Sequence, residues 1–127
     1  MTNDKKVEWT LRFAVAGEFI GHGVFALQQK AGWFKYFEAV GITSPDTIGS
    51  LLTLTGAVDI VLGILVLVRL IPILLLWMTL WGTWTALLRP LAGEPVWDFV
   101  ERFANIGAPL ALLFMRGVPR SIIGWFR

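Results

Sequence analysis

The chain contains no cysteine and a single histidine, and these two shortages exclude several kinds of site. Without thiols the chain cannot form a disulfide, exchange dithiols or ligate an iron–sulfur cluster. A zinc site built from this chain alone would lack ligands, so we expect no metal site. Bis-histidine ligation of haem would need a second histidine from a partner, which disfavours haem as a cofactor.

Charged residues are also scarce. They make up 16% of the 127 residues, whereas soluble domains carry roughly a quarter. The formal net charge of +2 is small and scattered, which argues against a nucleic-acid partner. Hydrophobic residues make up 56% of the chain. This composition is typical of an integral membrane protein, and we expect one domain spanning residues 1–127 with no separate soluble unit.

Four long apolar stretches follow one another, at about residues 9–27, 48–68, 70–88 and 99–115. Each has roughly the 17 to 25 residues that an α-helix needs to cross the hydrocarbon core of a bilayer. None shows the period-2 alternation of β-strands, and a helix satisfies its own backbone hydrogen bonds in lipid. The sequence therefore predicts an all-α fold, a transmembrane four-helix bundle.

The connections between these stretches differ in length and composition. Residues 28–43 interleave aromatic and charged side chains, which predicts a short amphipathic helix lying in the membrane interface between spans one and two. Little more than Arg69 separates the second stretch from the third, and Pro72 lies where a helix N-terminus tolerates proline. We therefore expect these two helices to form a tight antiparallel hairpin.

The distribution of Lys and Arg predicts an orientation. More of these residues fall on the side that holds the two termini than on the side of the first and third connections. The positive-inside rule then predicts a multi-pass protein of the cell inner (cytoplasmic) membrane with both termini in the cytoplasm.

Ionisable and polar residues lie within or beside every apolar stretch, and their placement is the best indication of function. Such residues are costly at membrane depth and usually face the bundle interior. In the predicted orientation they gather in the outer half of the membrane, which indicates one outward-facing pocket rather than a continuous pore. The set comprises Glu18 and His22 in the first stretch, Asp59 in the second, Arg89 at the end of the third, and Glu101, Arg102 and Asn105 at the start of the fourth.

Glu18, His22 and Asp59 are the candidate catalytic residues. Glu18 and His22 stand four residues apart on one helical face, where the carboxylate can orient the imidazole as a proton acceptor or donor. Asp59 lies between Gly56 and Gly63, whose spacing favours close packing of helices in lipid. Asp59 would then be brought close to a neighbouring helix.

Ion pairs between helices are the competing interpretation of these polar residues. In particular, Arg89 and the pair Glu101 and Arg102 fit an ionic clasp that holds the third and fourth helices together. In that case the polar residues stabilise the bundle and form no site.

Three tryptophans form a stripe down the third stretch. Trp77, Trp81 and Trp84 recur at helical spacing on one face. Their indole rings can stack on a flat ligand such as a quinone, and each N–H can donate to a carbonyl oxygen. Packing in the bundle or contact with lipid explains the same stripe without a ligand. The three tryptophans join the candidate ligand-binding residues, with Arg89, Glu101, Arg102 and Asn105.

A set of short motifs runs through the chain. They are Arg12 ahead of a small and aromatic run through Gly17 to Phe19, then Gly21-His22-Gly23, then Lys30, then Gly56-x-x-Asp59-x-x-x-Gly63, and finally Asn105. In these features most of the chain resembles the DoxX-like family of small four-helix membrane proteins, which includes a subunit type linked to thiosulfate:quinone oxidoreduction. The resemblance implies a quinone-linked or accessory role. It also implies functional roles for Arg12 and Lys30, as ligand-binding residues, beside His22, Asp59 and Asn105.

Three functions fit these observations. The first is a subunit of a membrane redox system that binds a quinone or another small molecule and depends on a redox partner protein, so that any enzymatic role needs that partner. The second is a non-enzymatic bundle that binds lipid or assembles partners, further copies of itself included. The third, a small transporter, is disfavoured by the apolar inner half.

Overall fold

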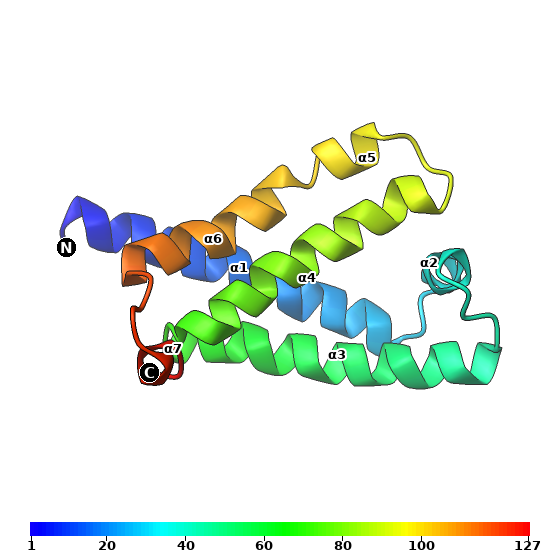
Figure 1. Ribbon diagram of the computed structural model, residues 1–127, viewed down its shortest axis with the longest axis horizontal. Helices are drawn as coiled ribbons and strands as arrows, with labels where there is room; N and C mark the ends of the chain where they lie inside the picture. Colours follow the sequence, from blue (N-terminus) through cyan, green and yellow to red (C-terminus); the bar gives the residue numbers. More distant parts are fainter.

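The computed structural model describes all 127 residues and is helical throughout, as the sequence predicts. Its four long helices are α1 (Asn3–Leu27), α3 (Pro45–Val68), α4 (Pro72–Leu91) and α6 (Phe103–Arg116). The shorter elements are a 3-10 turn (Ala31–Trp33), α2 (Phe34–Ala39), α5 (Trp97–Val100) and α7 (Ile122–Trp125). The two termini lie at the same end of the molecule (Figure 1).

Local sequence signals set the beginnings of three long helices. The hydroxyl oxygens of Thr2 and Ser44 accept hydrogen bonds from backbone N–H groups in the first turns of α1 and α3. Pro45 and Pro72 occupy the first positions of α3 and α4, where a missing N–H group costs nothing. As a result, α1 and α3 begin before residues 9 and 48, the predicted starts, while α4 begins slightly later than residue 70.

The fourth apolar stretch is not a single helix. The chain leaves the helical path at Glu101 and Arg102, so that the short α5 and the longer α6 replace the predicted span 99–115. Glu101 is exposed at this break, which separates α5 from α6 in Figure 1.

Helices α1 and α3 pack closely along their length because glycines lie where they meet. A Cβ atom on Gly56 would come within 2.7 Å of the Gly23 carbonyl oxygen, and one on Gly23 within 2.8 Å of the Gly56 carbonyl oxygen. A Cβ atom on Gly63 would lie 3.1 Å from the Ala16 carbonyl oxygen. The packing role predicted for Gly56 and Gly63 is confirmed.

The expected hairpin of α3 and α4 is open. The tight turn at residues 69–71 is present, but beyond it the two helices diverge like the arms of a V (Figure 1). Helix α4 packs against α6 instead, where a Cβ atom on Gly82 would lie 3.2 Å from the Asn105 carbonyl oxygen. We call the end that holds the turn the closed end. The opposite end, where α2 lies between α3 and α4, is the open end.

The main hydrophobic core belongs to the closed end. Its buried residues come from all four long helices and the turn: Val15, Ala16, Phe19, Leu62, Val66, Leu70, Leu75, Met78, Leu112 and Leu113. At the open end the buried cluster is smaller and consists of Ala26, Ile48 and Leu52. The space between the arms of the V is therefore not filled by core side chains.

Helix α3 is the one helix that is long and apolar enough, by length and composition, to cross a membrane. The others differ for identifiable reasons: α1 carries Arg12, Glu18 and His22, α4 carries Arg89 and three indoles, and α6 has only 14 residues. One such helix is weak support for membrane association. The four spans stay a prediction.

Candidate functional site: a cavity between diverging helices

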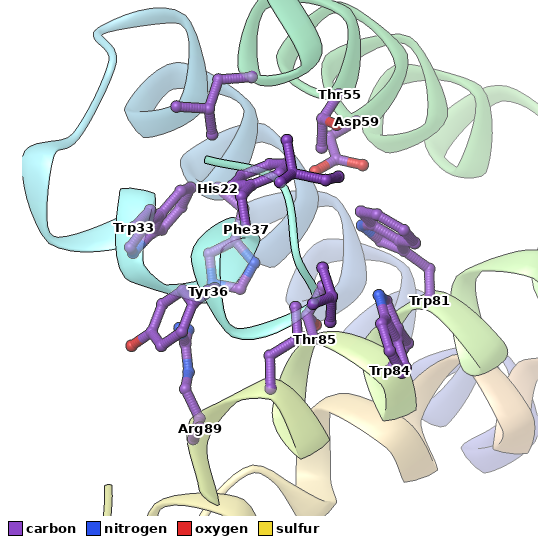
Figure 2. A pocket seen from close by; sticks show the side chains of 14 residues that line it. His22, Trp33, Tyr36, Phe37, Thr55, Asp59, Trp81, Trp84, Thr85 and Arg89 are labelled. Atoms are coloured by element: carbon purple, nitrogen blue, oxygen red, sulfur yellow. The ribbon is translucent and has the colours of Figure 1, made fainter. Parts of the chain in front are cut away.

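A cavity of about 280 Å³ lies between α3 and α4 at the open end (Figure 2). It exists because the two helices diverge and α2 fills only the mouth of the V. Most of the lining is apolar or aromatic: Trp33, Tyr36, Phe37, Val40, Ile42, Leu52, Trp81, Trp84 and Leu88. The polar lining residues are His22, Thr55, Asp59, Thr85 and Arg89. An apolar cavity with a few converging polar groups is the usual form of a small-molecule site.

Figure 2 shows how the labelled side chains surround the cavity. Asp59 on α3 and Arg89 on α4 lie on opposite sides of it. Trp81 and Trp84 form one wall, and Trp33 lies across from them. His22 packs edge-on against Trp33, with ring centroids 5.7 Å apart. The site therefore offers flat aromatic surfaces between an acidic and a basic end.

Arg89 is buried without an acidic partner. Its side chain is 6% exposed, its guanidinium lies 4.2 Å from the centroid of the Tyr36 ring, and its Nε atom has no hydrogen-bond partner. The clasp between Arg89 and the pair Glu101 and Arg102 does not form. The helix break explains this in part, because it leaves Glu101 exposed at the turn.

A second cleft, of about 370 Å³, adjoins the cavity and shares His22, Trp33, Tyr36 and Arg89 with it. We call it the basic cleft, because its remaining lining includes three further cations and no carboxylate: Phe25, Lys30, Gly32, Lys35 and Arg102. The Lys30 ammonium lies 4.5 Å from the Phe25 ring centroid and 5.3 Å from that of Trp33. The Nε atom of Arg102 is buried and unpartnered.

The three candidate catalytic residues are placed differently. His22 and Asp59 line the cavity, whereas Glu18 is half-buried on α1 and lies outside the lining. No hydrogen bond joins Glu18 to His22, which packs against Trp33 instead. Asp59 is 4% exposed and has neither a hydrogen bond nor an ion pair within the chain.

The candidate ligand-binding residues also divide between the cavity and the rest of the bundle. Trp81 and Trp84 line the cavity, whereas Trp77 is exposed and stacks on Trp81 with ring centroids 5.6 Å apart. Asn105 lies where α6 crosses α4, and its backbone faces Gly82. Neither Glu101 nor Asn105 lines either cleft.

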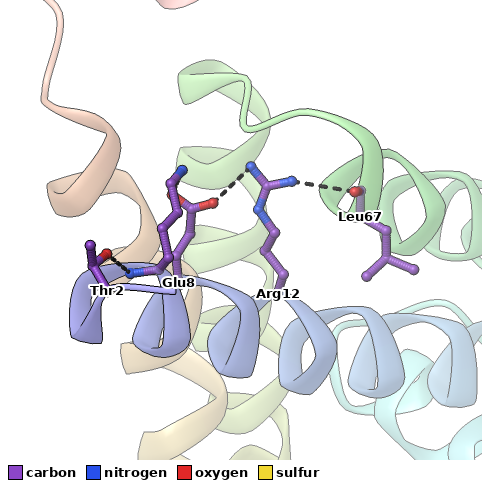
Figure 3. Close-up of polar contacts among 5 residues, drawn as sticks. Thr2, Glu8, Arg12 and Leu67 are labelled. Atoms are coloured by element: carbon purple, nitrogen blue, oxygen red, sulfur yellow. Dashed lines mark hydrogen bonds and ion pairs between the residues drawn. The ribbon is translucent and has the colours of Figure 1, made fainter.

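Arg12 contacts the end of α3 that leads into the turn (Figure 3), and it lines neither the cavity nor the basic cleft. Its Nη2 atom is 3.2 Å from a Glu8 carboxylate oxygen, and its Nη1 atom donates to the Leu67 carbonyl oxygen at 3.3 Å. That carbonyl is in the last turn of α3, where no intrahelical donor remains for it. Arg12 therefore links α1 to the end of α3.

Contacts that were not predicted from the sequence hold α2 over the mouth of the cavity. Lys35 and Tyr36 both meet one Glu94 carboxylate oxygen: the Lys35 Nζ atom is 2.7 Å from it, and the Tyr36 hydroxyl donates to it at 2.7 Å. We call these three residues the latch. The hydrogen bond with Lys35 lowers the pKa of Glu94, and the same bond raises the pKa of Lys35. Burial is the main cause of the raised pKa of Tyr36.

One missed lining residue did leave a signal in the sequence. Thr55 lies four residues before Asp59 and therefore shares its face of α3. The latch left no such signal, because Lys35 and Glu94 lie far apart in the chain and meet only through the fold.

Comparisons of the chain with family models, curated proteins and solved structures find no match. The relation to DoxX-like proteins stays a prediction from short sequence motifs.

Proposed function

We propose that this protein is a membrane-embedded helical bundle that binds a small ring-bearing molecule in the cavity between α3 and α4. The observation that carries the proposal is the cavity itself, with indole walls and with Asp59 and Arg89 on opposite sides. A quinone is one candidate class, because its flat ring can stack on Trp81 and Trp84 and its carbonyl oxygens can accept hydrogen bonds.

The polarity of α3 supports a membrane setting. Between residues 48 and 68 its one charged side chain, Asp59, is buried, whereas Leu54, Val61 and Ile64 are 61%, 54% and 51% exposed. Only 33% of its most apolar segment is buried inside the fold, whereas the core helix of a soluble domain is mostly buried. With 24 residues at about 1.5 Å each, it can span the roughly 30 Å hydrocarbon core. Lipid would cover the exposed apolar face.

The other long helices fit the same setting. Helices α1 and α4 have 25 and 20 residues, and α4 also exposes large apolar residues, among them Trp77, Leu80, Leu87 and Leu91. The proposal includes four membrane passes, the last one broken between α5 and α6, with α2 in the outer interface. Both termini would then lie on the cytoplasmic side.

A redox role would make this protein a quinone-binding subunit. His22 and Asp59, which line the cavity, would then hold or accept the protons that accompany reduction of the ring. Electrons would come from a redox partner protein, because the chain has neither a thiol nor a motif for a flavin or a metal.

The cavity can be tested with menadione, an uncharged naphthoquinone, added to the purified protein in a maltoside detergent. We expect saturable quenching of tryptophan fluorescence. Thr55→Phe, which places a ring inside the cavity, should weaken binding at least about tenfold, equivalent to about 1.4 kcal/mol. The matched control is Leu54→Phe, because the neighbouring Leu54 is 61% exposed on the outer face of α3.

Two results would contradict the proposal. One is quenching without saturation in the unaltered protein, which would indicate only partition of menadione into the detergent. The other is equal affinity in Thr55→Phe and Leu54→Phe, provided that circular dichroism shows both variants to be folded.

A further inference from the structure

We infer that the ligand of this cavity is an amphipathic anion, whose negatively charged group binds Arg89 and Arg102 in the basic cleft while its apolar body extends between α3 and α4. This inference rests on the proposed function, since it names the chemistry of the molecule that the cavity takes.

The first support is the state of Arg89. A buried charge is costly unless it is paired and hydrogen-bonded. Tyr36 covers one face of the guanidinium, but the Nε atom has no hydrogen-bond partner and Arg89 forms no ion pair within the chain. A guanidinium presents donors in a planar fork that matches a carboxylate or phosphate group. A bound anion would supply the missing partner.

The second support is the grouping of cations around the same cleft. Lys30 and Arg102 line it with Arg89, and none of the three takes part in an ion pair. The fourth cation, Lys35, is held by Glu94, which does not line the cleft. Like charges gathered in one concavity raise the local concentration of anions and repel one another when no anion is bound.

The third support is the continuity of the two spaces. Arg89, His22, Trp33 and Tyr36 line both the cavity and the basic cleft, so one molecule can occupy both. Asp59 lies across the cavity from Arg89, and no cation lines that side of the cavity (Figure 2). The anionic group therefore belongs at the Arg89 end, and the apolar body belongs between the indoles and Asp59.

The chemistry that fits is a carboxylate, a phosphate or an ionised ring hydroxyl on a compact ring or a short chain. Both an aromatic acid and an anionic lipid carry such a negatively charged group. Competition experiments with phosphatidylglycerol and with inorganic phosphate can distinguish these sources.

The test compares two ligands of nearly the same shape. Menadione is uncharged, whereas lawsone carries a ring hydroxyl in place of the methyl group and is an anion at neutral pH. We expect the unaltered protein to bind lawsone about tenfold to a hundredfold more tightly than menadione, the range expected for hydrogen bonds to a charged group. Arg102→Gln should remove most of this preference, because the affinity for lawsone should fall by a much larger factor than the affinity for menadione. Arg116→Gln, an exposed site at the closed end, is the matched control.

The outcomes separate this inference from the proposed function. Equal affinities for lawsone and menadione, with Thr55→Phe still blocking both, would overturn the inference and leave the cavity as a site for neutral ligands. A loss of menadione binding in Arg102→Gln as large as the loss of lawsone binding would also overturn it. If neither ligand bound saturably, the proposed function would fail as well.

Competition then identifies the source of the anion. Displacement of lawsone by phosphatidylglycerol in nanodiscs, but not by phosphatidylcholine, would support the inference and assign the site to a lipid head group. Displacement of lawsone by inorganic phosphate would also support the inference and would show that a free phosphate can occupy the anion site. A lawsone preference that resists both competitors would support a ring-bearing acid.

Discussion

The two ends of the bundle treat their buried polar groups in different ways. At the closed end, Arg12 forms an ion pair with Glu8 and donates to the Leu67 carbonyl oxygen (Figure 3), although its Nε atom has no partner. At the open end, Arg89 and Asp59 are more deeply buried and have no ion-pair partner in the chain. Charged groups that are paired within the chain join helices, whereas charged groups without a partner beside a cavity are suited to bind a ligand. We therefore expect the closed end to stabilise the fold and the open end to bind the proposed ligand.

The apolar residues show the same division. The closed end buries side chains from every long helix, whereas α3 and α4 leave a cavity between them at the open end. Stability and ligand affinity should consequently respond to changes at opposite ends of the molecule.

The largest difference in stability is expected between two variants of α4 that each replace one leucine by alanine. Leu75 is 1% exposed in the core of the closed end, so Leu75→Ala should leave a cavity and cost about 2–5 kcal/mol of unfolding free energy. Leu88 already borders the cavity, so Leu88→Ala should cost less than about 1.5 kcal/mol and admit a larger ligand. Thermal unfolding in detergent measures both. Equal losses of stability would show that the two ends do not differ in packing.

Replacing a carboxylate by its amide should have an intermediate effect on stability. The effect should differ in direction between the two ends. Glu8→Gln weakens the contact with Arg12 and should lower stability by about 0.5–1 kcal/mol, because that pair is partly exposed. Asp59→Asn removes an unpaired buried acid and should leave stability unchanged or raise it. The same unfolding assay applies to both variants. A clear loss of stability in Asp59→Asn would mean that this carboxyl group is part of the framework.

The sequence was sufficient for the parts of the fold that depend on local signals. The length of the apolar stretches predicted the long helices, Pro72 marked the start of α4, and the glycines beside Asp59 indicated a close helix crossing. These signals act within one helix or through a small residue at a contact. They did not require knowledge of which helices pair.

The opening of α3 and α4 was not predictable from the short turn between them. A three-residue connection fixes where two helices meet but not the angle at which they leave it. That angle follows from the close approach of α4 to α6 at Gly82 and from the bulk of Trp81 and Trp84 on the side of the cavity. Both are long-range contacts. The contact of Arg12 with the Leu67 carbonyl was not predictable for the same reason, because the two residues lie 55 positions apart in the chain.

The smallest effect on stability, and the sharpest kinetic one, is expected at the latch. Glu94→Gln removes the charge that holds Lys35 and should change the unfolding transition little, because the Lys35 side chain is about half exposed and solvent screens the ion pair. It should speed the release of menadione at neutral pH, because α2 covers the mouth of the cavity. Stopped-flow displacement measures this rate. The control is Glu38→Gln, because Glu38 is exposed on α2 and forms no ion pair with the latch.

The pH dependence of the latch has a definite sign. Glu94 has a pKa below its ordinary value of 4.5, so its contribution is complete above about pH 4.5 and is lost as the pH falls through the lowered pKa. Lys35 has a pKa above 10.5, so its contribution is complete below that pH and is lost only as the pH rises through the raised pKa. The latch should therefore stay closed between these limits, and its opening in acid should accelerate the release of menadione. In Glu94→Gln the acid acceleration should disappear; if it persists, a group other than the latch controls access to the cavity.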